Sequence, residues 1–370
     1  MRNIADTIAR MARAGAPAQF HAGPSRLTRL TEFGTNPGAL LGHSYVPRDL
    51  PSVAPLVVVL HGCTQTAAGY DHGSGWSQLA DRAGFAVLFP EQTRANNTNL
   101  CFNWFASEDT AQAGGEAESI AQMTETMIAR HGLDRSRVYV TGLSAGGAMT
   151  MAMLATRPDL FAGGAVIGGL AYGTATGVSQ AFDRMRGHGD TSDTALADAV
   201  RSGARGHDGA WPKLSIWHGA ADATVNVSNA DTIGRQWRAL HGVDAEAVRE
   251  EHSAAGMRRV WSDVAGRDVV EEWIVPGMGH GTPIDPSGDR LGKPGPFMLD
   301  VGISSTAMIA ESWGLVSADE AAAVAKAAPE RVAKRAIPVR GKAAAKTAPA
   351  PATGIQATIE TALRAAGLMR

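Results

Sequence analysis

Residues 138–155 constrain the fold more than any other stretch of this 370-residue chain. The stretch opens with Val138-Tyr139-Val140-Thr141, whose β-branched and aromatic residues are typical of a buried strand. It passes through Gly142-Leu143-Ser144-Ala145-Gly146 and continues as good helix formers over 148–155. A strand, a sharp turn and a helix around Gly-x-Ser-x-Gly predict a nucleophile elbow, and a glycine-rich turn with an incidental serine is the alternative.

The elbow makes specific demands on the backbone. We expect Ser144 to adopt a strained conformation at the carboxyl edge of a sheet, with the N-terminus of the following helix beneath it. Gly142 and Gly146 should supply the empty space where strand and helix cross.

Apolar runs and helical segments alternate along the rest of the chain. Strands are expected at 42–46, 56–60, 85–90, 165–167, 214–219 and 269–275, and helices at 77–84 and 116–131. The run at 56–60 is continuously apolar, as in a parallel strand that is covered on both faces. The pattern predicts an α/β protein of the α/β-hydrolase type, with a doubly wound, mostly parallel sheet. Residues 173–212 are less periodic and are interpreted as a cap or helical insertion.

Composition limits the partners of the chain. Hydrophobic residues make up 44%, and the formal net charge is −2, so no global field favours nucleic acid or a membrane surface. No apolar run approaches the ~20 residues that a transmembrane helix needs. Residues 1–25 are interpreted as a helical extension without the features of a secretory signal. For a complete chain the expected location is the cytoplasm, and an extracellular location is the alternative.

The composition changes after Leu315, which bounds a catalytic domain at 26–315. From Lys326 to Lys346 there are seven basic residues and one acid, Glu330, among many alanines and prolines. Such a segment buries too little apolar area to offset its ordering entropy, so 316–370 is expected to hold a linker and a short C-terminal helix. That helix, 354–368, docks on the domain, joins a partner or touches a hydrophobic surface. The basic tail is a candidate for contact with a polymer surface.

A serine nucleophile requires a base and an acid that orients it, and α/β-hydrolases carry them in the order Ser, Asp or Glu, His. Asp222 directly follows the strand at 214–219, which suits the acid. Asp231 is the main rival but falls inside the next predicted helix. Among eleven histidines, His280 has both the chain order and a glycine-rich loop after a strand. His218 is interpreted as a packing residue at its strand end.

Two backbone N–H donors are needed for an oxyanion hole. Ala145 follows the nucleophile and supplies one, and the loop His61-Gly62-Cys63 supplies the other, with Cys63 the preferred donor. His61 and Trp104 are candidates for substrate contact, although Trp104 also suits a core position. No histidine or cysteine cluster has metal-ligand spacing, so neither metal nor cofactor is expected.

Four separated motifs carry a family resemblance: residues 60–65, 101–105, 142–149 and 301–306. Together they resemble the polyhydroxybutyrate depolymerase family of esterases, which includes feruloyl and acetylxylan esterases. The resemblance covers about residues 30–315 and has the type 1 order, with the oxyanion histidine motif before the serine motif. The chain differs in lacking a recognisable secretion signal and polymer- or carbohydrate-binding module, and in carrying a basic tail.

The resemblance implies an α/β-hydrolase fold, a Ser144–Asp222–His280 triad, no metal, and a cysteine pair that is bridged in secreted members. The two cysteines, Cys63 and Cys101, are therefore expected within about 4.4–6.8 Å between α-carbons. In a cytosolic protein the pair would stay reduced. The implied function is a serine carboxylic-ester hydrolase acting on a short-chain hydroxyalkanoate polyester or its oligomers. The alternatives are a feruloyl or acetylxylan-type esterase and a non-catalytic protein of polymer granules.

Overall fold

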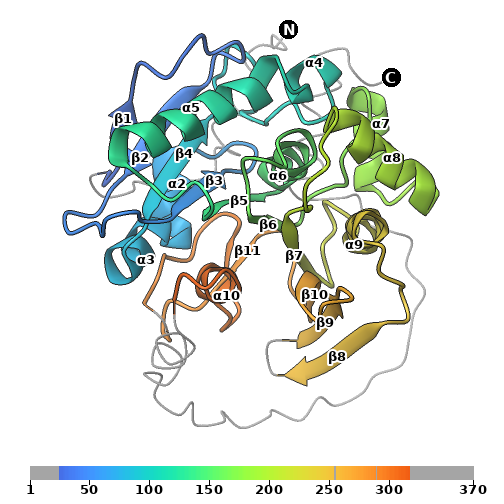
Figure 1. Cartoon of the computed structure of the whole chain (residues 1–370). Helices are drawn as coiled ribbons and strands as arrows, with labels where there is room; N and C mark the ends of the chain where they lie inside the picture. The colour runs from blue at the N-terminus through green and yellow to red at the C-terminus, as the bar shows by residue number, and fades with distance from the viewer. Residues whose placement is uncertain (1–24, 254–255, 289, 317–370) are drawn as a thin grey trace, which may run out of the picture.

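A ten-stranded sheet runs through the described part of the chain, residues 25–253, 256–288 and 290–316, in this computed structural model (Figure 1). Its strands are β1 (Thr28–Leu30), β2 (Leu41–Tyr45), β3 (Leu56–Leu60), β4 (Ala86–Glu91), β5 (Val138–Leu143), β6 (Gly163–Ile167), β7 (Lys213–Gly219), β8 (Val248–Ser253), β9 (Gly256–Ser262) and β10 (Asp268–Val275). The expectations for the N-terminal extension and for the C-terminal linker and helix lie outside the described residues.

The strand order is β1-β2-β4-β3-β5-β6-β7-β10-β9-β8. The centre, from β4 to β10, is parallel, whereas β1, β2, β9 and β8 extend it as antiparallel strands at the two edges. A separate parallel pair is formed by β11 (Thr282–Ile284) and β12 (Met298–Asp300). The predicted mostly parallel α/β sheet is therefore confirmed.

Helices cover both faces of the sheet. They are α2 (Ala67–Ser74), α3 (Trp76–Ala83), α4 (Ser107–Thr110), α5 (Gly115–His131), α6 (Ala145–Thr156), α7 (Val178–Met185), α8 (Asp193–Gly203), α9 (Ser228–His241) and α10 (Ser305–Ser312). One apolar cluster joins the sheet to α5, α6, α8 and α9, and a second joins the opposite face to α2, α3 and α10. Figure 1 shows α5 and α6 on one side of the strands and α3 and α10 on the other. None of the helices in the described part of the chain has the length and apolar content needed to span a bilayer.

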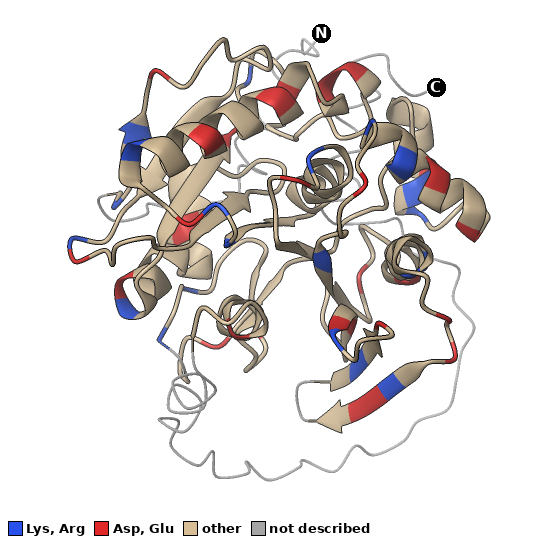
Figure 2. Cartoon of the chain, in the orientation of Figure 1, with Lys and Arg blue, Asp and Glu red and all other residues tan. Residues whose placement is uncertain are grey.

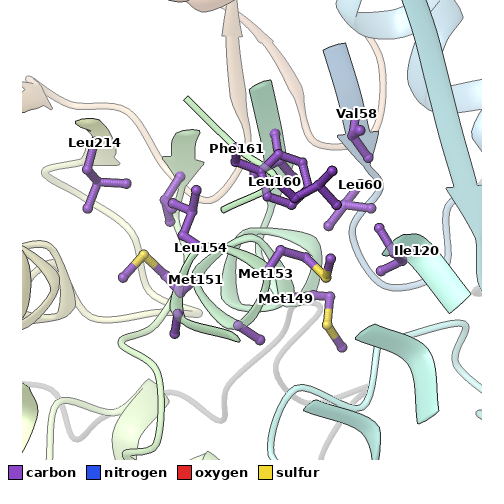
Figure 3. Packing of buried hydrophobic residues seen from close by; sticks show 14 of the residues in the cluster. Val58, Leu60, Ile120, Met149, Met151, Met153, Leu154, Leu160, Phe161 and Leu214 are labelled. Carbon is purple, nitrogen blue, oxygen red and sulfur yellow. The ribbon is translucent and has the colours of Figure 1, made fainter. Parts of the chain in front are cut away.

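Helix α6, which begins directly after Ser144, is the most buried helix of the fold. All twelve of its residues are buried and none is charged. Met149 and Met153 lie on the side of Leu60 of β3 and Ile120 of α5, whereas Leu154 lies on the side of Leu214 of β7 (Figure 3). The turn that carries Ser144 is thus anchored in the core.

The insertion expected at 173–212 contains α7 and α8. Helix α8 does not act as a cap, because its Leu196, Ala197 and Val200 belong to the main core. Helix α7 has only Ala181 buried and ends at Met185, which packs on a small cluster discussed below.

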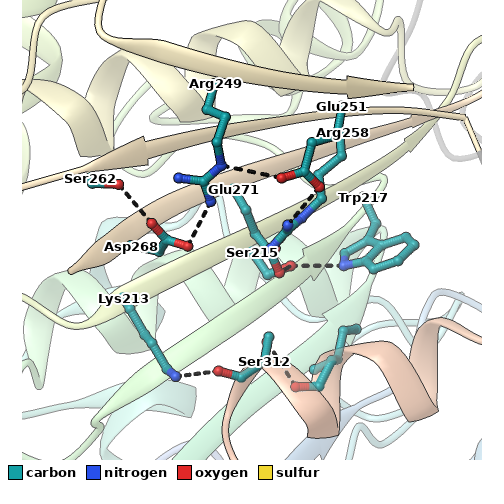
Figure 4. Close-up of polar contacts among 11 residues, drawn as sticks. Lys213, Ser215, Trp217, Arg249, Glu251, Arg258, Ser262, Asp268, Glu271 and Ser312 are labelled. Carbon is teal, nitrogen blue, oxygen red and sulfur yellow. Dashed lines mark hydrogen bonds and ion pairs between the residues drawn. The ribbon is translucent and has the colours of Figure 1, made fainter. Parts of the chain in front are cut away.

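The outer strands β8 and β9 were not predicted, because β8 reads Val-Arg-Glu-Glu-His-Ser and is exposed along most of its length. Cross-strand charge pairs stabilise it: Glu250 lies opposite Arg259 and Glu251 opposite Arg258. Arg258 also pairs with Glu271 of β10 at 2.8 Å (Figure 4). Charges of both signs are visible on β8 in Figure 2, as expected for an edge strand that avoids pairing with other chains.

A hollow of about 210 Å³ lies between β7, β10 and α10, lined by Lys213, Arg258, Glu271 and Trp313 among others. It opens at the amino ends of β7 and β10, whereas the site residues follow the carboxyl ends. The lining charges are already satisfied, since Lys213 bonds the Ser312 carbonyl and Arg258 pairs with Glu271 (Figure 4). This hollow is therefore separate from the site described next.

Candidate active site

The predicted site residues follow the carboxyl ends of neighbouring parallel strands. His61 to Cys63 follow β3, Ser144 follows β5, Asp222 follows β7 and His280 follows β10. Parallel strands end at the same edge of a sheet, which is where α/β proteins carry their sites. These loops are therefore brought together across more than 200 residues of sequence.

Ser144 has the strained backbone that the sequence predicted. Its φ is 58° and its ψ is −118°, a region that non-glycine residues rarely adopt. The Ser144 N–H donates to the Ile167 carbonyl at 2.8 Å, and its own carbonyl accepts from Ala148 N–H at 2.8 Å. The nucleophile elbow is thus fixed from the neighbouring strand on one side and from helix α6 on the other.

Two glycines make the crossing of strand and helix possible. A Cβ on Gly142 would lie 2.4 Å from the Gly146 carbonyl oxygen, and a Cβ on Gly146 would lie 2.4 Å from the Leu60 carbonyl oxygen. Both separations are far below van der Waals contact and involve backbone atoms, which cannot swing aside. The prediction that these two positions require glycine is confirmed.

Asp222 and His280 form a hydrogen-bonded pair. His280 Nδ1 lies 2.7 Å from Asp222 Oδ2, while Asp222 Oδ1 accepts from the N–H groups of Thr224 at 2.8 Å and Val225 at 2.9 Å. Burial by itself would raise the pKa of Asp222, but hydrogen bonds from His218 and His280, together with the electrostatic interaction with His280, hold that pKa far below its usual range. Asp222 is therefore an ionised acceptor for the His280 ring.

The loops that carry Asp222 and His280 are bonded to each other. Ala220 N–H donates to the Val275 carbonyl and Ala221 N–H to the Met278 carbonyl, both at 2.9 Å. A Cβ on Gly219 would lie 2.3 Å from the Met278 carbonyl oxygen, so glycine allows this close approach. The backbone thereby fixes the separation of the acid from the histidine.

Gly168 connects the Asp222–His280 pair to the elbow. A Cβ placed on Gly168 would lie 3.3 Å from His280 Cε1 and Nδ1 and 3.6 Å from Asp222 Oδ2. Its neighbour Ile167 holds the Ser144 N–H. Within the described residues, Ser144 Oγ and His280 Nε2 have no hydrogen-bond partner, so the expected Ser144–His280 hydrogen bond is not formed in this structure. Contacts of this kind often tighten only when substrate is bound.

Asp231, the rival acid, lies on α9 with a side chain that is 62% exposed, 4.0 Å from Arg238. It is not part of the cluster around His280, so the geometry favours Asp222.

Three successive N–H groups at the end of β3 explain the choice of oxyanion donor. Gly62 N–H donates to the Gln65 side chain at 2.8 Å and Thr64 N–H to the Asn99 carbonyl at 2.6 Å. Among the residues that the structure covers, the N–H of Cys63 has no acceptor. Ala145 is the first residue of α6, where N–H groups have no partner within the helix. Cys63 and Ala145 are thus the available donors beside Ser144.

His61 has a different task from the predicted substrate contact. It is 1% exposed, and its Nε2 accepts from Gln92 N–H at 3.1 Å. The proton is therefore on Nδ1, which donates to the Gly62 carbonyl at 2.8 Å. The Gly62 carbonyl and the Cys63 N–H belong to one planar trans peptide and point in opposite directions. Because His61 binds the Gly62 carbonyl, the Cys63 N–H is held on the opposite side of the peptide, away from His61. Both nitrogens of the His61 ring are engaged, so neither remains for a substrate.

Cys63 and Cys101 form a disulfide, with α-carbons 4.2 Å apart, slightly below the expected range. The bridge joins the oxyanion loop to the loop that carries Trp104. Trp104 is partly buried and packs with Met185 on a small cluster of Ala148, Leu170 and Val225. It therefore lies beside the site, partly in the core and partly accessible.

Beneath this loop lies a buried polar network that the sequence did not reveal. Glu116 is fully buried and accepts from Gln92 Nε2 and from the backbone and side chain of Asn103. Gln92 also donates to the Cys101 carbonyl at 3.0 Å. Burial raises the pKa of Glu116 to about 8. The only local signal was an acidic residue in the first turn of a helix, which is an ordinary capping position.

An elbow serine, an Asp–His pair and two N–H donors without an acceptor among the described residues, all at one edge of this sheet, define a serine hydrolase of the α/β-hydrolase class. Comparison with known proteins narrows the class. Residues 44–259 match the family Esterase PHB depolymerase. The chain belongs to that family and is a serine carboxylic-ester hydrolase.

Individual relatives include both polyester and carbohydrate esterases. The chain is 44% identical to poly(3-hydroxyalkanoate) depolymerase C of Paucimonas lemoignei over 78% of this chain and 70% of that protein. It is 32% identical to acetylxylan esterase A of Aspergillus ficuum over 70% of this chain and 86% of the relative. The solved acetyl xylan esterase from Aspergillus awamori matches with a TM-score of 0.68 and 27% identity, covering 78% of this chain and 99% of that one.

Proposed function

We propose that this esterase cleaves short-chain hydroxyalkanoate polyesters or their oligomers. The observation that carries the proposal is the 44% identity with a poly(3-hydroxyalkanoate) depolymerase, against 32% with an acetylxylan esterase. A feruloyl or acetylxylan-type specificity is the second candidate, because the acetyl xylan esterase from Aspergillus awamori is matched along 99% of its chain. A purely structural role on polymer granules is disfavoured by the Asp222–His280 pair and the free Ser144 hydroxyl.

Ser144 is proposed as the nucleophile, His280 as the base and Asp222 as the acid that orients it. Ser144 Oγ attacks the ester carbonyl while its proton passes to His280 Nε2. The ionised Asp222, 2.7 Å from Nδ1, stabilises the resulting imidazolium. Cys63 and Ala145 N–H groups bind the oxygen that becomes negative in the tetrahedral intermediate.

The intermediate then collapses to an acyl-enzyme. The C–O bond to the alcohol breaks, and the proton on His280 passes to the departing oxygen. A water molecule repeats the sequence on the acyl-enzyme, with His280 taking its proton and later returning it to Ser144 Oγ. The products are an alcohol and a carboxylic acid, so atoms and protons balance without a cofactor.

A product-release panel tests the substrate. Purified enzyme is incubated with poly(3-hydroxybutyrate), its trimer, methyl ferulate and acetylated xylan, with Ser144→Ala as the matched control. We expect hydroxybutyrate units to be released at the highest kcat/KM. Preference for methyl ferulate or acetylated xylan would establish the second candidate. Inactivity on these substrates and on p-nitrophenyl butyrate would contradict an enzymatic role.

The basic segment between Lys326 and Lys346 is proposed to contact the polymer surface, on the basis of its charge. Truncation after Val316 should lower adsorption to hydroxybutyrate granules, and added salt should weaken adsorption of the full chain. Turnover of a soluble ester should be unchanged. Equal adsorption of both proteins would contradict the proposal.

We also propose an oxidising compartment, the extracellular alternative, as the site of action. The Cys63–Cys101 bridge supports this, since disulfides are rare in the cytosol. Alkylating the thiols of intact producing cells before lysis, followed by mass spectrometry, tests it. Two alkylated cysteines would point to the cytoplasm.

A further inference from the structure

A second histidine lies against the proposed triad acid. His218, near the end of β7, is completely buried. Its Nε2 is 2.8 Å from the Val225 carbonyl oxygen and 3.4 Å from Asp222 Oδ2, the oxygen that also accepts from His280. A carbonyl oxygen can only accept, so Nε2 carries a proton and donates.

The other ring nitrogen gives an independent indication of how His218 is used. His218 Nδ1 is buried and has no hydrogen-bond partner among the described residues. A proton there would be buried without an acceptor, so the geometry accommodates the neutral tautomer with its proton on Nε2. On β7 this position shares the face of Leu214 and Ile216, which are apolar core residues. A residue chosen only for packing there would be apolar, because it would leave no polar atom unpaired.

We propose that His218 is a positioning residue for Asp222, an inference that rests on the triad roles proposed above. His218 holds the carbonyl of Val225, and the N–H of the same residue donates to Asp222 Oδ1 at 2.9 Å. The His218 ring thus holds Val225, and Val225 in turn holds the Asp222 carboxylate. His218 also lies 3.4 Å from Asp222 Oδ2, the oxygen that His280 bonds. With both oxygens held, Asp222 keeps the one orientation in which Oδ2 receives the proton of His280 Nδ1.

Three substitutions at this position separate the two ring nitrogens. In His218→Gln the amide nitrogen replaces Nε2, whereas in His218→Asn it replaces Nδ1 and cannot reach Val225. His218→Leu keeps the volume and removes both. Because His218 contacts the charged carboxylate of Asp222, we expect kcat to fall about 10-fold to 100-fold in His218→Leu and His218→Asn. KM should stay within about twofold, and Gln should recover kcat to within about threefold of the wild type.

The measured quantity is kcat for p-nitrophenyl butyrate per active site. The concentration of active sites is determined by titration with an organophosphate that reacts with the active-site serine, so unfolded protein does not lower the measured kcat. His241→Leu is the matched control, because it removes a histidine bond to the Pro212 carbonyl that has no connection with Asp222. It should lower the unfolding free energy without lowering kcat per site. The unfolding free energies of all variants are measured in urea.

A second comparison shows whether His218 acts through the acid. In an Asp222→Asn background, His218→Leu should cause almost no additional loss of kcat, because the orientation that it protects no longer matters. An undiminished additional loss, or a His218→Leu enzyme with wild-type kcat per site, would overturn the inference. If Asp222→Asn itself were fully active, the proposed triad would be wrong instead, so the two failures are distinguishable.

Discussion

Removing the Cys63–Cys101 bridge should cost stability before it costs chemistry. The cysteines are separated by 38 positions. In the chain-entropy description, closing a loop of that size removes about 13 cal/mol/K from the unfolded state, or about 4 kcal/mol at 25 °C. At about 2.1 cal/mol/K of unfolding entropy per residue over the catalytic domain, this corresponds to a loss of roughly 6–7 °C in Tm. The double variant Cys63→Ala/Cys101→Ala is the perturbation.

Catalysis should survive because other bonds hold the oxyanion loop. Thr64 N–H remains bonded to Asn99, and His61 remains bonded to the Gly62 carbonyl. At a temperature well below the transition, turnover of p-nitrophenyl butyrate by the double variant should stay within about threefold of the wild type, since the Cys63 N–H donor is backbone and is retained at alanine.

Urea unfolding and initial rates are the assays, and mild reduction of the wild type provides the control. Reduced wild type and double variant should agree in unfolding free energy, and reductant should not change the variant further. A difference in unfolding free energy below about 1 kcal/mol would refute the loop-entropy reasoning. A kcat loss above about tenfold with little change in stability would show that the bridge itself aims the donor.

Other predictions test the site and its surroundings. Ser144→Ala should lose several orders of magnitude in kcat, and adding His280→Ala should cost little more, because the two act as a unit; retention of over a tenth of turnover contradicts the assignment. Asp222→Asn should be severely impaired in the same assay, while Asp231→Asn should match the wild type. The reverse result would assign to Asp231 the role of the acid that orients His280. Burial raises the pKa of Glu116 from 4.5 to about 8, so its protonation favours folding below about pH 4.5 and this contribution is lost as the pH rises through 8. The unfolding free energy of the wild type, measured in urea at each pH, should therefore fall more steeply between about pH 5 and 8 than that of Glu116→Gln. An equal pH dependence of the two unfolding free energies would contradict this.

The parts of the fold that sequence predicted well are those in which burial and local propensity agree. The run at 56–60 is continuously apolar, has three β-branched valines at its centre and is fully buried, and its predicted limits coincide with β3. The order of Ser144, Asp222 and His280 was also informative, because parallel strands end at one edge and bring such loops together. Local pattern and global topology point to the same answer at these positions.

The missed features depend on partners that are distant in the chain. Strand β8 is held by charges on β9 and has no apolar alternation of its own. His61 was interpreted as a substrate contact because its bond to Gln92, 31 positions away, leaves no local trace. His218 was interpreted as packing for the same reason, since its contact with Val225 exists only after the loop has closed on Asp222.

The hydrogen bonds at the site suggest that catalysis and specificity are encoded separately. Ser144 N–H bonds Ile167, Gly168 N–H bonds Trp217 and Ala220 N–H bonds Val275, so backbone groups link the loops after β5, β6, β7 and β10 in succession. This arrangement continues the parallel hydrogen bonding beyond the strand ends and fixes the loops that carry Ser144, Asp222 and His280. Trp104 and Met185, by contrast, come from outside these hydrogen-bonded loops and reach the site only as partly buried side chains. Residues that distinguish one ester from another are therefore to be sought in this second group, where a change of side chain leaves the catalytic backbone in place.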